Sequence, residues 1–260
     1  MSNKIDRYKE VNDLIHSLLK EVKCVLGEQF IGMYIHGSLA VGDFNPKNSD
    51  VDFLVVTKEM VTEDIFCSLK KIHEKIVAEG NKFAKKLEGS YVSKEFLISK
   101  EPPKEPRPYV NEGEFSLENY GYEWILEKYT NREYGIVIEG PNPKDIISPI
   151  SAAELKKASL ILLNSWWAPI VIEPSLLRDC HYQAYAVLTM CRILYMFDCG
   201  AIVSKKVSAK WALSTLGEDW KILIEKALEW EEEVVFNHME ETQDFIRFAL
   251  EYTAKDNITS

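Results

Sequence analysis

Apolar residues recur at helical spacing in two stretches of the first half of the chain, and short apolar runs lie around them. The first stretch covers residues 5–26 and ends at Gly27, and the second begins at the capping residue Thr62 and ends at Gly80. Both are predicted to be helices with one buried face. The runs rich in β-branched and aromatic residues predict strands at FIGMYIHGS (30–38), SDVDFLVVT (49–57) and KLEGSYVSKEFLI (86–98).

A proline-rich stretch, EPPKEPRPY (101–109), interrupts this alternation. Each proline lacks an amide donor, so the stretch is predicted to be neither a regular helix nor a central strand. It would form either a surface excursion or a lid over a site. A helix around 119–130, a strand at 134–140 and a linker at 140–149 are expected to follow.

From Ser151 onward the pattern is helical only. Ser151 and Glu154 have the spacing of a capping box, and further helices fit residues 176–198, 204–216, 218–232 and 239–254. The pattern predicts two domains with an α+β organisation. Residues 1–150 would form a small mixed sheet with flanking helices, and residues 151–260 an all-helical bundle.

Charge and composition narrow the choice of partners. The chain has 41 acidic and 31 basic residues and a net charge of −10, which disfavours nucleic acid because Lys and Arg must neutralise its phosphates. A negative charge suits a cationic small molecule, although it could equally serve only solubility. No apolar run is long enough for a membrane span and the N-terminus lacks a signal-peptide pattern, so we expect a cytoplasmic monomer without membrane contact. Five cysteines without zinc-ligand spacing predict free, mostly buried thiols.

The stretch that carries chemistry is Gly37-Ser38, an eleven-residue gap, and then Asp50-Val51-Asp52. Carboxylates at i and i+2 of a strand point to one face, where they can share a hard cation. Magnesium fits because it binds through one or two carboxylates together with substrate phosphates. Gly37 allows the backbone to approach a ligand, and Ser38 offers a hydroxyl and an amide to a phosphate.

Each half of this pattern has an ordinary explanation. A DxD on a strand is usually a solvated face, and a Gly-Ser pair is usually a turn. Here the Gly-Ser pair closes one predicted strand and the DxD opens the next, and FLVV follows Asp52. A run as apolar as that has no solvated face. His36 is interpreted as a buried, hydrogen-bonded neighbour of the turn and not as a ligand.

The combined pattern resembles the signature of the polymerase-β-like nucleotidyltransferase superfamily. The closer resemblance is to the aminoglycoside adenylyltransferases that act on streptomycin and spectinomycin. It covers most of the chain through the segments YIHGSLAVGDFNPKNSDVDFLVV, Leu87-Glu88, EYGIVIEGP, VLTMCRILY (187–195) and SAKWAL (208–213).

The resemblance implies roles for individual residues. Asp50 and Asp52, joined by Glu88, would ligate two Mg²⁺ ions, and Gly37 and Ser38 would approach the phosphates of ATP. Glu88 would also be the base that takes the proton of the acceptor hydroxyl, a role that suits a third carboxylate beside two metal ligands. Arg192 and Lys205 would hold the triphosphate. A surface strand residue is the ordinary account of Glu88, and a helix salt bridge is that of Arg192.

The implied reaction moves AMP from ATP to a hydroxyl of an aminoglycoside or aminocyclitol antibiotic. This chain has Tyr182 and Tyr185 where its relatives have polar and acidic residues, and the tryptophan of the streptomycin users is not evident. Both departures favour a spectinomycin-like acceptor over streptomycin. The alternatives are another acceptor (a protein side chain, a lincosamide-like drug or a nucleic-acid end) and a non-catalytic nucleotide-binding module.

Overall fold

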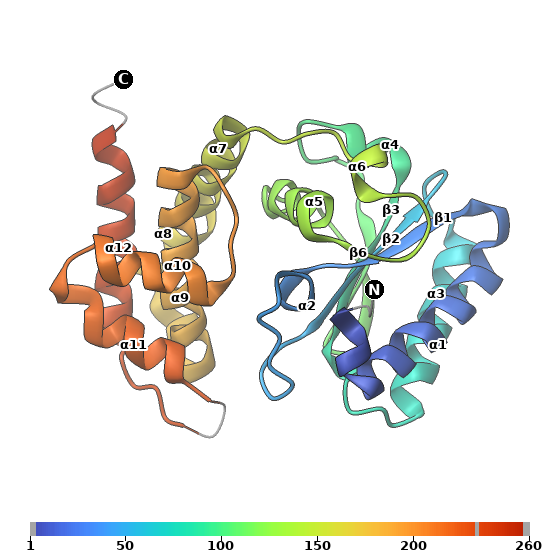
Figure 1. Ribbon diagram of the computed structural model, residues 1–260, viewed down its shortest axis with the longest axis horizontal. Helices are drawn as coiled ribbons and strands as arrows, with labels where there is room; N and C mark the ends of the chain where they lie inside the picture. Colours follow the sequence, from blue (N-terminus) through green and yellow to red (C-terminus); the bar gives the residue numbers. More distant parts are fainter. Residues whose placement is uncertain (1–3, 232–233, 257–260) are drawn as a thin grey trace. The chain divides into compact units, whose positions relative to one another are not determined.

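The computed structural model describes residues 4–231 and 234–256. The chain forms two compact units, Met1–Pro149 and Ile150–Ser260. Figure 1 shows a sheet with flanking helices in the first unit and helices in the second.

The first unit is built on a six-stranded mixed sheet with the order β5-β4-β3-β2-β1-β6. β2 and β3 run parallel, and every other neighbouring pair runs antiparallel. The small mixed sheet expected for this half of the chain is confirmed. The strands are β1 (Phe30–Ile35), β2 (Val51–Thr57), β3 (Leu87–Ser93), β4 (Arg107–Asn111), β5 (Glu114–Glu118) and β6 (Ile136–Glu139).

Alternate residues of the strands pack against different helices. Phe53 and Val55 of β2 share a buried cluster with α1 (Lys9–Leu26) and α3 (Glu63–Ala78). Leu54 and Val56 pack with Trp124 of α5 (Glu123–Tyr134) and with α4 (Lys94–Ile98) and α6 (Pro143–Ile146). Figure 1 shows α1 and α3 on one face of the sheet and α5 on the other. Because side chains alternate along a strand, Asp52 lies on the α5 face with Leu54 and Val56.

Several predicted elements differ from the structure. The proline-rich prediction was wrong at its end: residues 107–109 belong to β4, which pairs with both β3 and β5. Pro108 is tolerated because the ladder between β3 and β4 registers at the neighbouring Tyr109 and Val110. The strand predicted at 86–98 stops at Ser93 and continues as α4. The turn after β1 forms a short helix, α2 (Gly37–Val41), and the 140–149 segment contains α6. α5 begins and ends about four residues later than predicted.

Within the described residues, the second unit contains helices and no strand, as expected. The capping box at its start is present: the Ser151 hydroxyl accepts from the Glu154 amide (3.2 Å), and the Glu154 carboxylate accepts from the Ser151 amide (2.8 Å). The α-helices are α7 (Ala152–Leu162), α8 (Ala168–Ile172), α9 (Cys180–Cys199), α10 (Lys205–Thr215), α11 (Lys221–Glu229) and α12 (Met239–Asp256), with a π-helical segment at Leu163–Trp167. The central helix is α9, and α7, α10, α11 and α12 pack on it.

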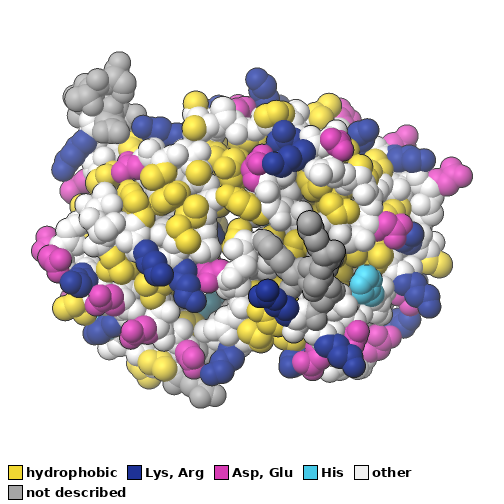
Figure 2. Space-filling view, viewed as in Figure 1, with side chains coloured by type: hydrophobic (Ala, Val, Ile, Leu, Met, Phe, Trp, Pro, Cys, Tyr) yellow, Lys and Arg dark blue, Asp and Glu magenta, His cyan; other side chains and the backbone are white. Residues whose placement is uncertain are grey.

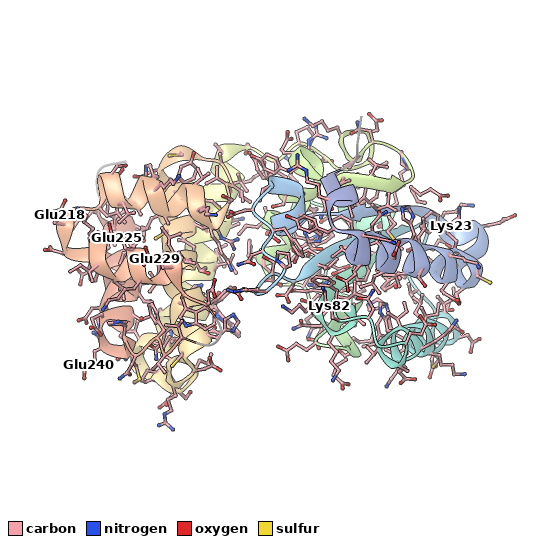
Figure 3. All side chains as sticks on the ribbon, turned by 60° about the horizontal axis from the view of Figure 1, so that its bottom comes forward. Lys23, Lys82, Glu218, Glu225, Glu229 and Glu240 are labelled. Carbon is pink, nitrogen blue, oxygen red and sulfur yellow. The ribbon has the colours of Figure 1, made fainter. Side chains whose placement is uncertain are left out.

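The surface charge is dispersed. On the face of the described residues drawn in Figure 2, basic side chains alternate with acidic ones and form no continuous basic band. Figure 3 labels exposed glutamates of the second unit, Glu218, Glu225, Glu229 and Glu240, which come from the 3₁₀ turn Glu218–Trp220 and from α11 and α12. Part of the net negative charge therefore lies on ordinary solvated helix faces. The five cysteines are free, but the expectation of mostly buried thiols was wrong, because three of them are exposed.

Candidate active site

The strand register brings two of the predicted carboxylates together. β2 and β3 are parallel neighbours, and Asp52 is the register partner of Glu88. Val92, which is even-numbered like Glu88, packs on the α5 face of β3, so the Glu88 side chain lies on the same face as that of Asp52. Both side chains are half-buried. A surface strand residue, the ordinary account of Glu88, does not fit this position.

The Gly37 turn lies directly against Asp52. Gly37 has φ 58°, and a Cβ at that position would be only 1.9 Å from Oδ2 of Asp52. The preceding residue is fixed as well, because the His36 amide donates to the Asp52 carbonyl at 3.0 Å. Only glycine can occupy this position without displacing the carboxylate.

Ser38 follows in the first turn of α2. Its hydroxyl oxygen is buried and has no hydrogen-bond partner among the described residues. Such an atom is unusual in a folded protein, since buried hydroxyls normally find partners. An oxygen of a bound phosphate would supply one.

Asp50 is placed by the loop that precedes β2. Residues 45–49 form a compact turn in which the Asn45 amide donates to the Ser49 hydroxyl (3.0 Å) and the Ser49 amide to the Asn45 carbonyl (2.8 Å). The Lys86 ammonium donates to the Lys47 carbonyl and so ties this loop to the start of β3. Asp50 is exposed at the end of the loop, two residues before Asp52.

The oxygen-rich character of the site suits a hard cation. Asp50 and Asp52 supply carboxylate oxygens, the Gly37 turn lies against Asp52, and the Ser38 hydroxyl follows in that turn. Among the residues that the structure describes, however, no three His, Cys, Asp or Glu side chains converge as a ready-made metal site. Magnesium would suit such a site, because it completes its shell with substrate phosphates and water.

Glu88 is held by a tyrosine that the sequence reading missed. The Tyr109 hydroxyl of β4 donates to Oε1 of Glu88. Burial, with the neighbouring Glu88 carboxylate, raises the pKa of Tyr109. The phenol therefore stays protonated and remains a donor to Glu88. Tyr109 lies at the end of the proline-rich stretch, where no strand was expected.

Arg107 is a buried cation on the same hairpin. Its side chain donates to the Ser90 hydroxyl (2.8 Å) and the Asn119 carbonyl (3.0 Å), and its guanidinium lies 4.5 Å from the centre of the Tyr120 ring. Because Arg107 is 5% exposed, its charge acts in a poorly screened environment. The field of Arg107 reaches Glu127 of α5: burial raises the pKa of Glu127, and Arg107 acts in the opposite direction.

Glu127 and His36 form a second polar pair on this face. Oε1 of Glu127, on α5, lies 3.8 Å from Nε2 of His36, and their side chains are 15% and 12% exposed. Burial lowers the pKa of His36, and burial raises that of Glu127. Both shifts favour the uncharged forms. His36 is a half-buried neighbour of the turn, hydrogen-bonded through its amide, while Glu127 carried no signal in the sequence beyond being one polar residue of a helix.

The two predicted cations of the second unit are both related to Tyr185 of α9. Arg192 lies seven residues, or two turns, after Tyr185 on α9, so both project from one side of the helix. Lys205, the first residue of α10, has its ammonium 5.0 Å from the centre of the Tyr185 ring. Five of the predicted site residues thus belong to the first unit and two to the second.

Comparisons with known proteins match both halves of the chain. Residues 18–157 match the family described as nucleotidyltransferase domain, and residues 145–256 match the C-terminal domain of aminoglycoside adenylyltransferase. The chain is 25% identical to spectinomycin 9-adenylyltransferase of Campylobacter jejuni over 224 residues (83% of each chain). It is 26% identical to that of Staphylococcus aureus over 240 residues (87% of this chain, 86% of the other).

The fold matches a solved relative. A crystal structure of a spectinomycin adenyltransferase from Enterococcus faecalis, with ATP and spectinomycin, superposes with a TM-score of 0.75 at 17% identity and covers 92% of this chain and 99% of that one. In the described part of this chain, no helix is long and apolar enough to cross a membrane.

Proposed function

The chain belongs to the aminoglycoside adenylyltransferase family of nucleotidyltransferases, and from this premise we propose that it transfers AMP from ATP to a hydroxyl of a spectinomycin-like aminocyclitol. It is an adenylyltransferase by family. The observation that carries the proposed chemistry is the register of Asp52 with Glu88 against the Gly37 turn.

The proposed reaction has one transfer step. The acceptor hydroxyl loses its proton to the Glu88 carboxylate, its oxygen forms a bond to the α-phosphorus of ATP, and the bond from that phosphorus to the pyrophosphate oxygen breaks. Pyrophosphate leaves. Tyr109, which donates to Oε1 of Glu88, keeps the carboxylate oriented. General-base help of this kind contributes typically about 10²- to 10⁴-fold.

Asp50 and Asp52 would hold Mg²⁺, with Glu88 beside them. The bound metal would neutralise phosphate charge and stabilise the attacking and leaving oxygens. The protein itself contributes by positioning the metal-binding carboxylate and the phosphate-binding hydroxyl. The Gly37 turn fixes the Asp52 carboxylate, and the buried Ser38 hydroxyl offers a hydrogen bond to a phosphate oxygen. Transfer of this type depends mainly on positioning and charge neutralisation.

We propose a functional division near residue 150, with the transfer chemistry in the first unit and a grip on the triphosphate in the second. Arg192 and Lys205 would supply that grip. Lys205 begins α10, where a cation is unfavourable for the helix dipole, and a phosphate nearby would offset this cost.

The acceptor assignment rests on the names of the relatives and on charge. Spectinomycin is the acceptor named for the relatives from C. jejuni and S. aureus. Aminocyclitols carry amines that are positive at neutral pH, and the carboxylates on the α5 face include Asp52 and Glu88. Tyr182 and Tyr185, with ring centres 5.6 Å apart, stand where streptomycin users have polar and acidic residues. A relative from Escherichia coli, named aminoglycoside (3'')(9) adenylyltransferase, is 22% identical over 253 residues.

The test is a panel assay of pyrophosphate release with Mg²⁺ and ATP. Spectinomycin should give turnover, and streptomycin little or none. Turnover with streptomycin alone would reverse the acceptor assignment. Release with neither drug, in a protein that binds ATP, would leave another acceptor as the substrate. Failure to bind ATP would remove the proposed reaction altogether.

A further inference from the structure

His36 connects the end of β1 to the Gly37–Ser38 turn and is held on two sides. Its amide donates to the Asp52 carbonyl at 3.0 Å, and its ring lies close to the backbone of Phe53. The next residue, Gly37, already lies against the Asp52 carboxylate. A small displacement of His36 would therefore move the turn relative to Asp52.

One ring nitrogen of His36, Nε2, faces Glu127. Nε2 is buried without a hydrogen-bond partner among the described residues, and the carboxylate that faces it is Glu127, with Oε1 at 3.8 Å. That separation exceeds hydrogen-bond length by less than 1 Å. Active-site hydrogen bonds are often long without ligand and tighten when the ligand binds. α5, which carries Glu127, packs on α2, which begins at Gly37.

Resting on the proposed function, we propose that Glu127 is a positioning residue that acts through His36. It holds the Gly37–Ser38 turn against Asp52 so that the turn receives the phosphates of ATP. A largely buried carboxyl group beside Glu88 is costly to keep, and an apolar residue would pack at this place without that cost. The hydrogen-bonding requirement of His36 explains why a carboxyl group is present at position 127.

If Glu127 positions the turn, replacing it should weaken nucleotide binding and leave acceptor binding nearly unchanged. Glu127→Leu should weaken binding of a non-hydrolysable ATP analogue with Mg²⁺ by about 10- to 100-fold, the usual effect of losing a residue that orients a site residue. The acceptor KM should change less than twofold. Glu127→Gln should restore most of the affinity, because its amide can donate to Nε2 of His36. Glu133→Leu is the control: Glu133 lies on the same helix and pairs with Lys144 at 2.9 Å.

The experiment combines calorimetry of the analogue with steady-state kinetics, and it adds His36→Phe and the double variant His36→Phe/Glu127→Leu. If Glu127 acts through His36, the double variant is no worse than the poorer single one, since the second change removes an interaction already lost. The double variant also replaces the polar pair by apolar groups, so it remains informative if Glu127→Leu does not fold.

Three results would overturn the inference: unchanged analogue affinity in Glu127→Leu, additive losses in the double variant, or a rise confined to the acceptor KM. The last would make Glu127 an acceptor-binding residue. A wild-type protein that does not bind the analogue would instead refute the proposed function.

Discussion

Replacing Gly37 by alanine tests how closely the turn approaches Asp52. The new Cβ would lie 1.9 Å from Oδ2 and 2.5 Å from Cγ of Asp52, so the carboxylate or the turn must move by about 1.5 Å to restore van der Waals contact. The φ of 58° adds a cost of about 1–2 kcal/mol for a residue with a Cβ. A misplacement of about 1 Å at a reacting centre lowers turnover roughly 10²-fold, so we expect at least that loss in Gly37→Ala.

Gly42 supplies a matched control. Its φ is 83°, and a Cβ there would meet no atom within 4 Å. Gly42→Ala therefore has the same kind of backbone strain without the clash. Urea unfolding should show that both variants fold with reduced stability, the loss being larger in Gly37→Ala, whereas pyrophosphate release should be lost only in Gly37→Ala. Turnover of Gly37→Ala within threefold of Gly42→Ala would refute the claim that Gly37 positions Asp52.

Three further predictions follow from the site and the core. Glu88→Gln keeps shape but cannot accept a proton, so turnover should fall about 10²- to 10⁴-fold while calorimetry shows nearly unchanged ATP binding; a loss of ATP binding that explains the whole defect would make Glu88 mainly a metal ligand. Lys205→Ala should weaken ATP binding more than acceptor binding, and the reverse order would remove Lys205 from the triphosphate site. Burial lowers the pKa of His73 to about 4 in the folded protein, against 6.5 in the unfolded chain. The unfolded chain therefore binds the proton more tightly, and the free energy of unfolding falls as the pH drops below 6.5. Between pH 7 and 4.5, urea unfolding of the wild type should lose about 2 kcal/mol more than His73→Phe, and equal losses would contradict a buried neutral His73.

The elements that the sequence predicted well are those with strong local patterns. The amphipathic helix before Gly27 forms because one of its faces is apolar, and the valine-rich strand after Asp50 forms because its apolar residues are buried on both faces of the sheet. The spacing of Gly37-Ser38 and the DxD predicted a shared site, and the approach of Gly37 to Asp52 agrees with that interpretation. The roles of the individual site residues stay predictions.

The missed residues have no local signal. β4 was overlooked because Pro108 argues against a strand, although its pairing with β5 is set by partners in the hairpin. Because β4 was not predicted as a strand, Tyr109 and Arg107 were not predicted as site residues. Glu127 looks like any polar residue of a weakly amphipathic helix, and only the packing of α5 on α2 brings it to His36. Long-range pairing of this kind is not encoded in periodicity.

Mass analysis of the drug after incubation with ATP, Mg²⁺ and the protein tests the central claim most directly. With the wild-type protein, spectinomycin should gain one adenylyl group and pyrophosphate should appear in equal amount. With Asp52→Asn, which removes a carboxylate proposed to hold Mg²⁺, the drug should remain unmodified while the protein stays folded. An adenylylated drug in the Asp52→Asn sample at near wild-type rate, or an unmodified drug with the wild-type protein, would contradict the account.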